Sequence, residues 1–404
     1  MLNFRSALIA LILFASVFIL PAQRKNIFPP GTNLAGPYSP GVIANGYLYV
    51  SGQGAKSKAG KFPESTGDQT RQTLDNVREI VEAAGLTMDH LVYAQVYATN
   101  SDQFADIDTA WKAYFPKGGP ARALLGVAKL PQDTPVEINA VAVIDLGTKE
   151  ALAIDANKIP GAMIAGGRVY ISDCAGLDPI TGAAPSDPEA QVKLALDRMS
   201  KILKSAGIDF RHMIFVNPYM TDQISYEAMN RAYASRFEFG NTPARATIQV
   251  ASLPKGANIH FTGVAVRDLS KRRAVRPRNM DPSPTASPCV LAGTSLFCSA
   301  KSGFIPGPHG GLFASTVETQ VRQTMRNLLD GLEEAGLSLS NVVSTNVYLD
   351  VVAVFPKMNR IYALYFPTDQ PSRTTVQQRP SVVRASNEKD EWPTLEQISL
   401  IAER

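Results

Sequence analysis

Apolar side chains recur along this chain at helical and strand spacings, and the two spacings alternate in the same order three times. In each third, a stripe of residues three or four positions apart predicts a helix that a glycine closes. The stripes are Thr70, Leu74, Val77, Val81 and Ala84 before Gly85; Val192, Leu196, Met199 and Leu203 before Gly207; and Val321, Met325, Leu328 and Leu332 before Gly336. Alternation then predicts a strand at 91–98, 213–220 and 342–349, followed by a second helix with aromatic residues on its buried face.

Each repeat begins with the signal of a β-hairpin. Two apolar runs flank Asn45-Gly46 and Gly166-Gly167, dipeptides that accept the positive φ of a tight turn, while Gly293-Thr294 is a weaker turn signal. A serine stands at the same register of the second hairpin strand in every repeat: Ser51, Ser172 and Ser299. The predicted unit is therefore α+β: two strands, a helix, a strand, a helix and two strands, with a mixed sheet covered by two helices.

A short arginine segment marks the equivalent strand of the three repeats. Pro120-Ala121-Arg122-Ala123 returns as Pro243-Ala244-Arg245-Ala246 and as Pro371-Ser372-Arg373-Thr374, with arginines 123 and 128 residues apart. Such periods are long enough for whole domains. We predict domains at 24–148, 149–270 and 271–404, with a proline- and arginine-rich linker at 270–288 and a polar insertion at 381–394. The open sheet faces are expected to pack together as an intrachain pseudo-trimer.

The N-terminus has the pattern of a secretory signal. Arg5 precedes an apolar run at 7–20, and Pro21-Ala22-Gln23 follows with a small residue suited to cleavage. This run is shorter than the roughly 20 residues that cross a bilayer. We predict a signal peptide at 1–23 and export to the periplasm or the medium, with an uncleaved membrane anchor as the alternative.

Composition and charge narrow the classes of partner. Forty basic and 36 acidic residues give a net charge of +4, too weak and dispersed for a nucleic-acid surface. The four histidines have no metal-ligand spacing, and no glycine-rich phosphate loop joins a strand to a helix. No metal or cofactor is expected, and a small molecule is the expected partner.

Three cysteines are an odd number for an exported protein. A two-residue turn at Gly293-Thr294 would place Cys289 opposite Cys298, at a separation that a disulfide tolerates. The sequence leaves this bridge open. Cys174 is interpreted as a small buried residue rather than a nucleophile.

Several segments together resemble the YjgF/RidA family of imine deaminases. They are Gly36-Pro37-Tyr38-Ser39, Val50-Ser51-Gly52-Gln53, the run at 69–76, Pro120-Ala121-Arg122 and Val136-Glu137-Ile138. The resemblance spans the first repeat and extends more loosely over the other two. It implies a chorismate-mutase-like fold and a trimer with a central β-barrel and ligand clefts between neighbours. Here one polypeptide would supply all three units, so we expect a monomer.

The resemblance also implies a reaction, the hydrolysis of enamine or imine acids to 2-keto acids and ammonia. Arg122 would bind the substrate carboxylate through its planar fork of donors, and Glu137 would hold the attacking water. The other residues carried over as substrate-binding are Tyr38, Ser51, Asp108 and Leu124 in the first repeat; Ser172, Asn230 and Arg245 in the second; and Ser299, Asn359, Arg373 and Glu396 in the third.

The three repeats depart from the family pattern in different ways. Asp108 replaces a common asparagine and Leu124 a frequent cysteine, whereas the second repeat has His260 at the glutamate position and Ile159 at the tyrosine. Ala286 replaces the tyrosine in the third repeat. The first repeat is therefore expected to hold the working site. The alternative, which export favours, is a non-catalytic protein that binds small carboxylates or serves as a scaffold; a ribonuclease is a weaker third.

Overall fold

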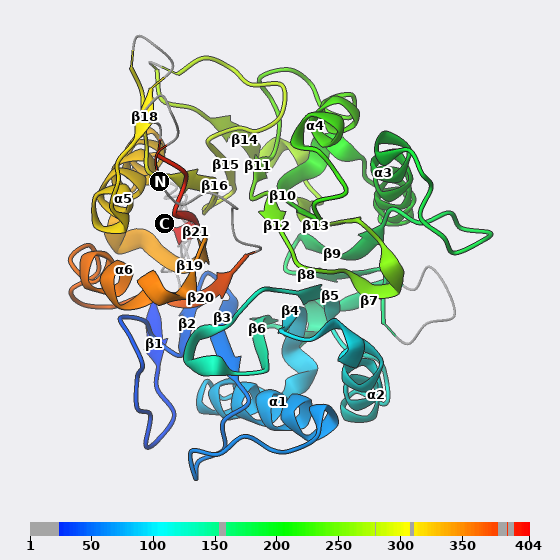
Figure 1. The fold of residues 1–404 in the computed structure, drawn as a ribbon, viewed down its shortest axis with the longest axis vertical. Helices are drawn as coiled ribbons and strands as arrows, with labels where there is room; N and C mark the ends of the chain where they lie inside the picture. The colour runs from blue at the N-terminus through cyan, green and yellow to red at the C-terminus, as the bar shows by residue number, and fades with distance from the viewer. Residues whose placement is uncertain (1–23, 153–158, 279, 308–310, 379–385, 387–391) are drawn as a thin grey trace, which may run out of the picture.

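Three domains follow one another along the chain and share one order of elements (Figure 1). The computed structural model describes residues 24–152, 159–278, 280–307, 311–378, 386 and 392–404. The predicted signal peptide and most of the predicted insertion lie outside these residues. Each domain has a mixed sheet with helices, as the hydrophobic pattern predicts. Among the described helices, none is long and apolar enough to cross a membrane.

The first domain sets the pattern. Its elements are β1 (Lys25–Ile27), β2 (Gly41–Ala44), β3 (Tyr47–Gly54), α1 (Thr66–Ala83), β4 (Leu91–Ala98), α2 (Phe104–Tyr114), β5 (Ala121–Gly126) and β6 (Val136–Val143). The strand order is β1-β2-β3-β6-β4-β5, and only β4 and β5 pair in parallel. The α2 crossover between these two strands accounts for the parallel pair.

The other two domains repeat this order. The second contains β7 (Glu150–Leu152), β8 (Ala162–Ala165), β9 (Arg168–Ala175), α3 (Pro188–Ser205), β10 (Met213–Met220), α4 (Tyr226–Ala234), β11 (Ala244–Arg245), β12 (Ile248–Gln249) and β13 (Ile259–Val266). The third contains β14 (Arg272–Val275), β15 (Cys289–Ala292), β16 (Ser295–Ser302), β17 (Phe304–Ile305), β18 (Leu312–Phe313), α5 (Val317–Glu334), β19 (Val342–Leu349), α6 (Phe355–Tyr362), β20 (Ser372–Gln377) and β21 (Glu396–Glu403).

The predicted turns and helix ends form where special backbone angles are needed. Asn45 and Gly46 have φ values of 46° and 79°, which suit the tight turn between β2 and β3. Gly85 has φ 78° after α1, and the backbone N–H of Leu86 donates back to Val81. A glycine in this conformation ends the helix without Cβ strain.

A short edge strand at the start of each domain was not predicted. β1, β7 and β14 each pair with the first hairpin strand of their domain. They have three or four residues, too few to show an alternating pattern. β14 also lies inside the predicted linker at 270–288, so part of that segment belongs to the sheet of the third domain.

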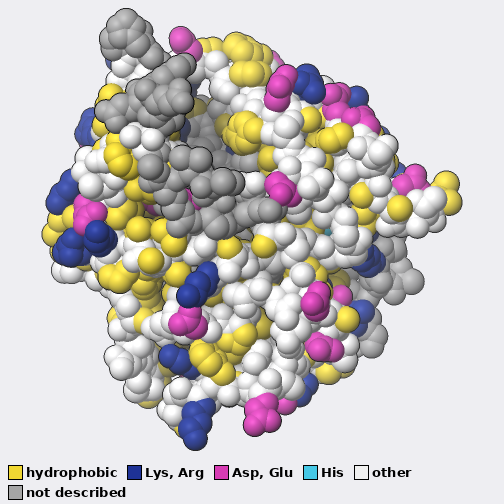
Figure 2. Space-filling model, in the orientation of Figure 1, with side chains coloured by type: hydrophobic (Ala, Val, Ile, Leu, Met, Phe, Trp, Pro, Cys, Tyr) yellow, Lys and Arg dark blue, Asp and Glu magenta, His cyan; other side chains and the backbone are white. Residues whose placement is uncertain are grey.

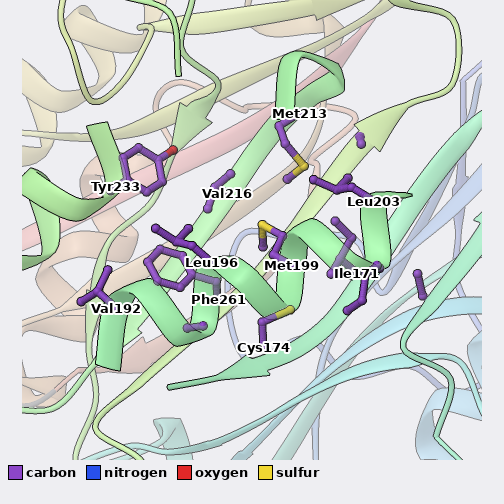
Figure 3. Packing of buried hydrophobic residues seen from close by; sticks show 14 of the residues in the cluster. Ile171, Cys174, Val192, Leu196, Met199, Leu203, Met213, Val216, Tyr233 and Phe261 are labelled. Atoms are coloured by element: carbon purple, nitrogen blue, oxygen red, sulfur yellow. The ribbon is translucent and has the colours of Figure 1, made fainter. Parts of the chain in front are cut away.

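Each domain has its own core between the sheet and the two helices. Figure 3 shows the core of the second domain, where Leu196 and Met199 of α3 pack with Phe261 of β13. In Figure 1 the helix pairs lie on the outer rim and the strands face the middle. A further cluster there contains Leu125, Ile248 and Val376, one from each domain. The strands form three separate main sheets in the described chain, without the closed barrel that the resemblance implies.

The structure contains the bridge that the sequence left open, and the third cysteine is buried as predicted. Cys289 and Cys298 are paired across β15 and β16 and form a disulfide, with a Cα–Cα distance of 4.0 Å. Cys174 is free and buried, and burial raises the pKa of its thiol.

Candidate active site

A cavity of about 420 Å³ opens between the third and first domains. Its wall includes Arg373 and Thr375 of β20, and Tyr38, Gly52 and Glu137 of the first domain. The site therefore combines residues from the two ends of the chain.

A serine hydroxyl joins the two domains at this cavity. Ser51 Oγ of β3 donates to Ser39 O and accepts a 2.8 Å hydrogen bond from the backbone N–H of Arg373. The same bridge recurs from Ser172 to Arg122 N at 3.0 Å and from Ser299 to Arg245 N at 2.8 Å. The arginine strand of each domain is thus fixed beside the hairpin of the next domain, and the first domain follows the third. These serines position the arginines, since both hydrogen-bonding directions of their hydroxyls are already used.

Arg373 is held among aromatic rings with only 4% of its surface exposed. Its guanidinium carbon lies 5.4 Å from the ring centre of Tyr38 and 5.0 Å from that of Tyr362. Burial lowers the pKa of Arg373, and the phenols of Tyr362 and Tyr38 oppose this effect. Within the described chain, its Nη1 has no hydrogen-bond partner. A buried arginine nitrogen without a partner is suited to an anionic ligand.

Glu137 lies in the same cavity and is 6% exposed. Burial raises the pKa of its carboxyl to about 8, although Arg373 and a hydrogen bond from the Thr375 backbone lower it. Gly52 provides the space, because a Cβ at that position would collide with Glu137 Oε1. A carboxyl with a pKa raised in this way can act as a proton donor near neutral pH.

A second cavity of about 260 Å³ lies between the first and second domains. Arg122 of β5 reaches it but forms an ion pair with Asp108 of α2. The opposite wall carries Asp173 and His260, whose Oδ1 and Nδ1 atoms are 3.5 Å apart. This cleft thus has an arginine that is already partly neutralised, and an imidazole where the first domain has a carboxyl.

The third boundary, between the second and third domains, has no acid at the equivalent positions. Arg245 donates from Nη1 to Asn230 Oδ1 at 2.7 Å and from Nη2 to Tyr226 OH at 2.9 Å. Thr247 and Gln397 line a cavity of about 540 Å³ at this boundary. The guanidinium is satisfied within its own domain, and the facing side chain is a neutral amide.

The predicted combination of Arg122 and Glu137 in one site is wrong. Arg122 lines the cavity between domains one and two, whereas Glu137 lines the one between domains three and one. The error arises because each cleft takes its arginine from one domain and its acid from the next. The first repeat contains all the residue types of a site but does not bring them together.

The predicted role of Glu396 is also wrong, by one residue of register. Glu396 pairs with Leu349 as Val136 pairs with Ala98, so it occupies the position of a core valine. Its Oε1 accepts a hydrogen bond from Thr324 of α5, and burial raises its pKa to about 8. Gln397, opposite Tyr348, is the true counterpart of Glu137, opposite Tyr97.

The remaining predicted residues are spread over the three boundaries. Tyr38 lines the cavity with Arg373 and Glu137, while Leu124 and Ser172 line the cavity with Arg122. Asn359 lies beside Arg373, since both would contact a Cβ added at Gly36. Asp173 and Thr375 also line these cavities but were not predicted from the sequence. Alignment of the repeats at their serines and arginines would have found both.

The fold and the site define a tandem α+β chain with cavities between its domains. Two of these cavities are lined by a buried arginine. The chain belongs to the family described as Endoribonuclease L-PSP, whose model matches residues 31–144, 150–267 and 281–381. This is the YjgF/RidA family that the sequence motifs indicate.

Relatives named as deaminases match one domain-sized part of the chain. The 2-iminobutanoate/2-iminopropanoate deaminase of Escherichia coli K12 is 39% identical over 112 residues, which cover 27% of this chain and 88% of the relative. The protein of the same name from Bos taurus is 37% identical over 110 residues, 27% of this chain and 80% of the relative. The crystal structure of the YjgF gene product from E. coli aligns at 36% identity and a TM-score of 0.29, covering 30% of this chain and 99% of that one.

Proposed function

We propose that the cavity between the third and first domains hydrolyses small imine or enamine acids to 2-keto acids and ammonia. The observation that carries this proposal is that Arg373 Nη1, without a partner in the described chain, and the buried carboxyl of Glu137 line one open cavity. The deaminase names of the relatives agree with this class of reaction.

The proposed chemistry uses few groups. The Arg373 guanidinium binds the substrate carboxylate, and the rings of Tyr38 and Phe355 hold that guanidinium in place. Protonated Glu137 donates a hydrogen bond to the imine nitrogen, which makes the C=N carbon more electrophilic. Water then adds to this carbon and ammonia leaves. Imines hydrolyse in water without a catalyst, so positioning and one proton donor are sufficient for catalysis.

An assay with an imine made in place tests this function. An amino-acid oxidase generates 2-iminopropanoate, and the purified protein is expected to accelerate its decay to pyruvate. Arg373→Ala should lower kcat/KM by roughly 10- to 100-fold, the value of a lost charged hydrogen bond. Arg231→Ala is the matched control, because Arg231 is exposed on α4 and pairs with Glu189 and Glu227.

The alternative function is binding without catalysis. The satisfied guanidinium of Arg245 is an observation that favours a binding or scaffold role for the cleft between the second and third domains. A wild-type protein that binds pyruvate but leaves the imine decay unchanged would establish this alternative for the whole chain.

We further propose that one chain acts as a monomeric pseudo-trimer. The serine bridges between all three domain pairs and the cluster shared by the three domains support this arrangement. The interspersed Lys, Arg, Asp and Glu side chains on the face in Figure 2 agree with a small-molecule rather than a nucleic-acid partner. Sedimentation equilibrium should give the mass of one chain; a mass three times larger would contradict the proposal.

Export through the N-terminal segment remains part of the proposal. The Cys289–Cys298 disulfide agrees with an oxidising compartment, where such bonds persist. Mass spectrometry of protein from the periplasm of a Gram-negative expression host should give a chain that lacks residues 1–23. Intact, cytosolic protein with reduced cysteines would contradict export.

A further inference from the structure

In the cleft between the first and second domains, the carboxylate of Asp173 takes the place that Glu137 has in the first cavity. Asp173 is on β9, which corresponds to β3 of the first domain, whereas Glu137 is on β6. Asp173 follows Ser172 as Gly52 follows Ser51, so the two residues are equivalent in the repeats. Both pairs lie where β3 and β9 bulge against β6 and β13. In the first domain the space above Gly52 is filled by the Glu137 carboxyl. In the second domain, residue 173 itself supplies a carboxylate at this place.

Both carboxylates bind the same backbone position of the neighbouring domain. The N–H of Leu124, two residues after Arg122, donates to Asp173 Oδ2 at 3.0 Å. The N–H of Thr375, two residues after Arg373, donates to Glu137. Both clefts therefore have a carboxylate at the same backbone N–H. His260 of β13 occupies the strand position that Glu137 has in β6.

Buried polar atoms without partners gather beside this carboxylate. His260 is 3% exposed; its Nδ1 lies 3.5 Å from Asp173 Oδ1, and its Nε2 has no hydrogen bond in the described chain. Nε and Nη1 of Arg122 also lack a hydrogen bond there. Leaving such atoms unpaired costs free energy, so several of them lining one cavity indicate a polar ligand.

We propose that this cleft is a second hydrolytic site, in which His260 is the proton acceptor and Asp173 positions it. Arg122 binds the carboxylate of a small imino acid through its unpartnered nitrogens; this substrate class rests on the function proposed above. Asp108 holds the Arg122 side chain and is not displaced. Lys112 and Lys255 line the same cavity and favour an anionic substrate.

The proton transfers balance without a further reactant. The water oxygen bonds to the imine carbon while His260 takes one water proton, and the C=N electron pair moves to nitrogen. His260 returns its proton to that nitrogen, giving a carbinolamine. The carbinolamine O–H proton then moves to the nitrogen as the C–N bond breaks, which releases ammonia and forms the 2-keto acid.

The kinetic test lowers the contribution of the first site with Arg373→Ala and measures the remaining decay of 2-iminopropanoate. His260→Gln in this background should lower the residual rate several-fold, whereas His90→Gln, a half-buried residue that lines none of the three cavities, should not change it. Asp173→Asn should lower kcat with little change in KM, and Arg122→Ala should raise KM. An active wild type whose Arg373→Ala variant has no residual activity would overturn the second site.

A binding test separates this inference from the first proposal. Pyruvate is added to the Arg373→Ala variant with isotope-labelled histidine rings, and the NMR signal of His260 is expected to shift. Arg122→Ala should abolish the shift. No shift would overturn the second site even if the first cavity proves active, and an inactive wild type with a shifted His260 would overturn its catalytic step.

The shared position of the two carboxylates has its own test. His260→Glu alone would bring two carboxylates into one space and should lower the urea midpoint. Addition of Asp173→Gly recreates the arrangement of the first domain and should restore the midpoint. Equal midpoints of the single and double variants would contradict the proposal that Asp173 and Glu137 occupy equivalent space.

Discussion

The neighbours of each buried arginine determine what its guanidinium can bind. Arg122, Arg245 and Arg373 have the same sequence context, but their guanidiniums meet an acid, an amide with a phenol, and an open cavity, respectively. Only Arg373 combines an unpartnered nitrogen with a carboxyl whose pKa is raised to about 8. The chemistry of each arginine thus depends on one or two neighbours rather than on its own segment.

The raised pKa of Glu137 predicts a pH profile for the proposed reaction. If protonated Glu137 is the donor, kcat should be constant near neutral pH and fall as the pH rises through about 8, where the carboxyl ionises. Glu137→Gln should lower kcat and abolish this basic limb. Stopped-flow measurement of imine decay from pH 6 to 9.5 checks the profile. A rate that instead increases through pH 8 would identify the carboxylate as the active form.

At the scale of the strand, a shift of one residue moves a side chain to the other face of the sheet. Glu396 and Gln397 are neighbours, but Glu396 faces α5 in the core and Gln397 faces the cleft. From the sequence alone, Glu396 is the better match to Glu137 because both are glutamates. Only the pairing of β21 with β19 shows that Gln397 occupies the equivalent position.

The buried position of Glu396 predicts a pH-dependent stability. Its pKa is raised from 4.5 to about 8 by burial, so the folded state binds the proton more tightly than the unfolded state. Its contribution to stability is full below pH 4.5 and is lost as the pH rises to about 8. Glu396→Gln should therefore be more stable than wild type at pH 9, by roughly 1–3 kcal/mol, and similar at pH 4.5. Urea unfolding at both values measures this, with exposed Glu334→Gln as the control.

The serine bridges are a second feature of the strands that can be tested. Ser299→Ala would leave the N–H of Arg245 and the carbonyl of Ser287 without their partner. We expect a loss of about 1–3 kcal/mol in the free energy of unfolding, because both groups are buried. Urea unfolding of Ser299→Ala beside that of the exposed Ser340→Ala measures the difference. Equal stabilities would show that the bridge contributes nothing.

At the scale of the whole molecule, a buried ion pair joins side chains from all three domains. Arg168 of the second domain lies 3.1 Å from Glu403 of the third, and Glu403 Oε1 accepts from Tyr49 OH of the first at 2.8 Å. Asn45 and Ser295 donate to the other carboxylate oxygen. We infer that this network helps to specify which domain faces are adjacent, because a wrong pairing would bury a charge without its partner.

Removal of the Glu403 carboxylate should destabilise the protein more than removal of a carboxylate from an exposed ion pair. Glu403→Ala leaves Arg168 buried without its counter-charge, and we expect a loss of about 3–5 kcal/mol. Glu333→Ala is the matched control, since Glu333 is exposed beside Arg326 and such pairs contribute about 0–1 kcal/mol. Thermal and urea unfolding of both variants gives the comparison. Similar losses for the two would exclude a special role of the buried pair.

The sequence by itself determined the repeated unit and the family. Helical stripes, turn dipeptides and the serine and arginine positions depend on local periodicity and backbone angles, which can be seen within one segment. Only the tertiary structure decided which arginine meets which acid, because every cleft is formed by two domains. It also decided that Glu396 lies in the core and that Asp173 stands in for Glu137, since both depend on strand register and on close contacts between strands.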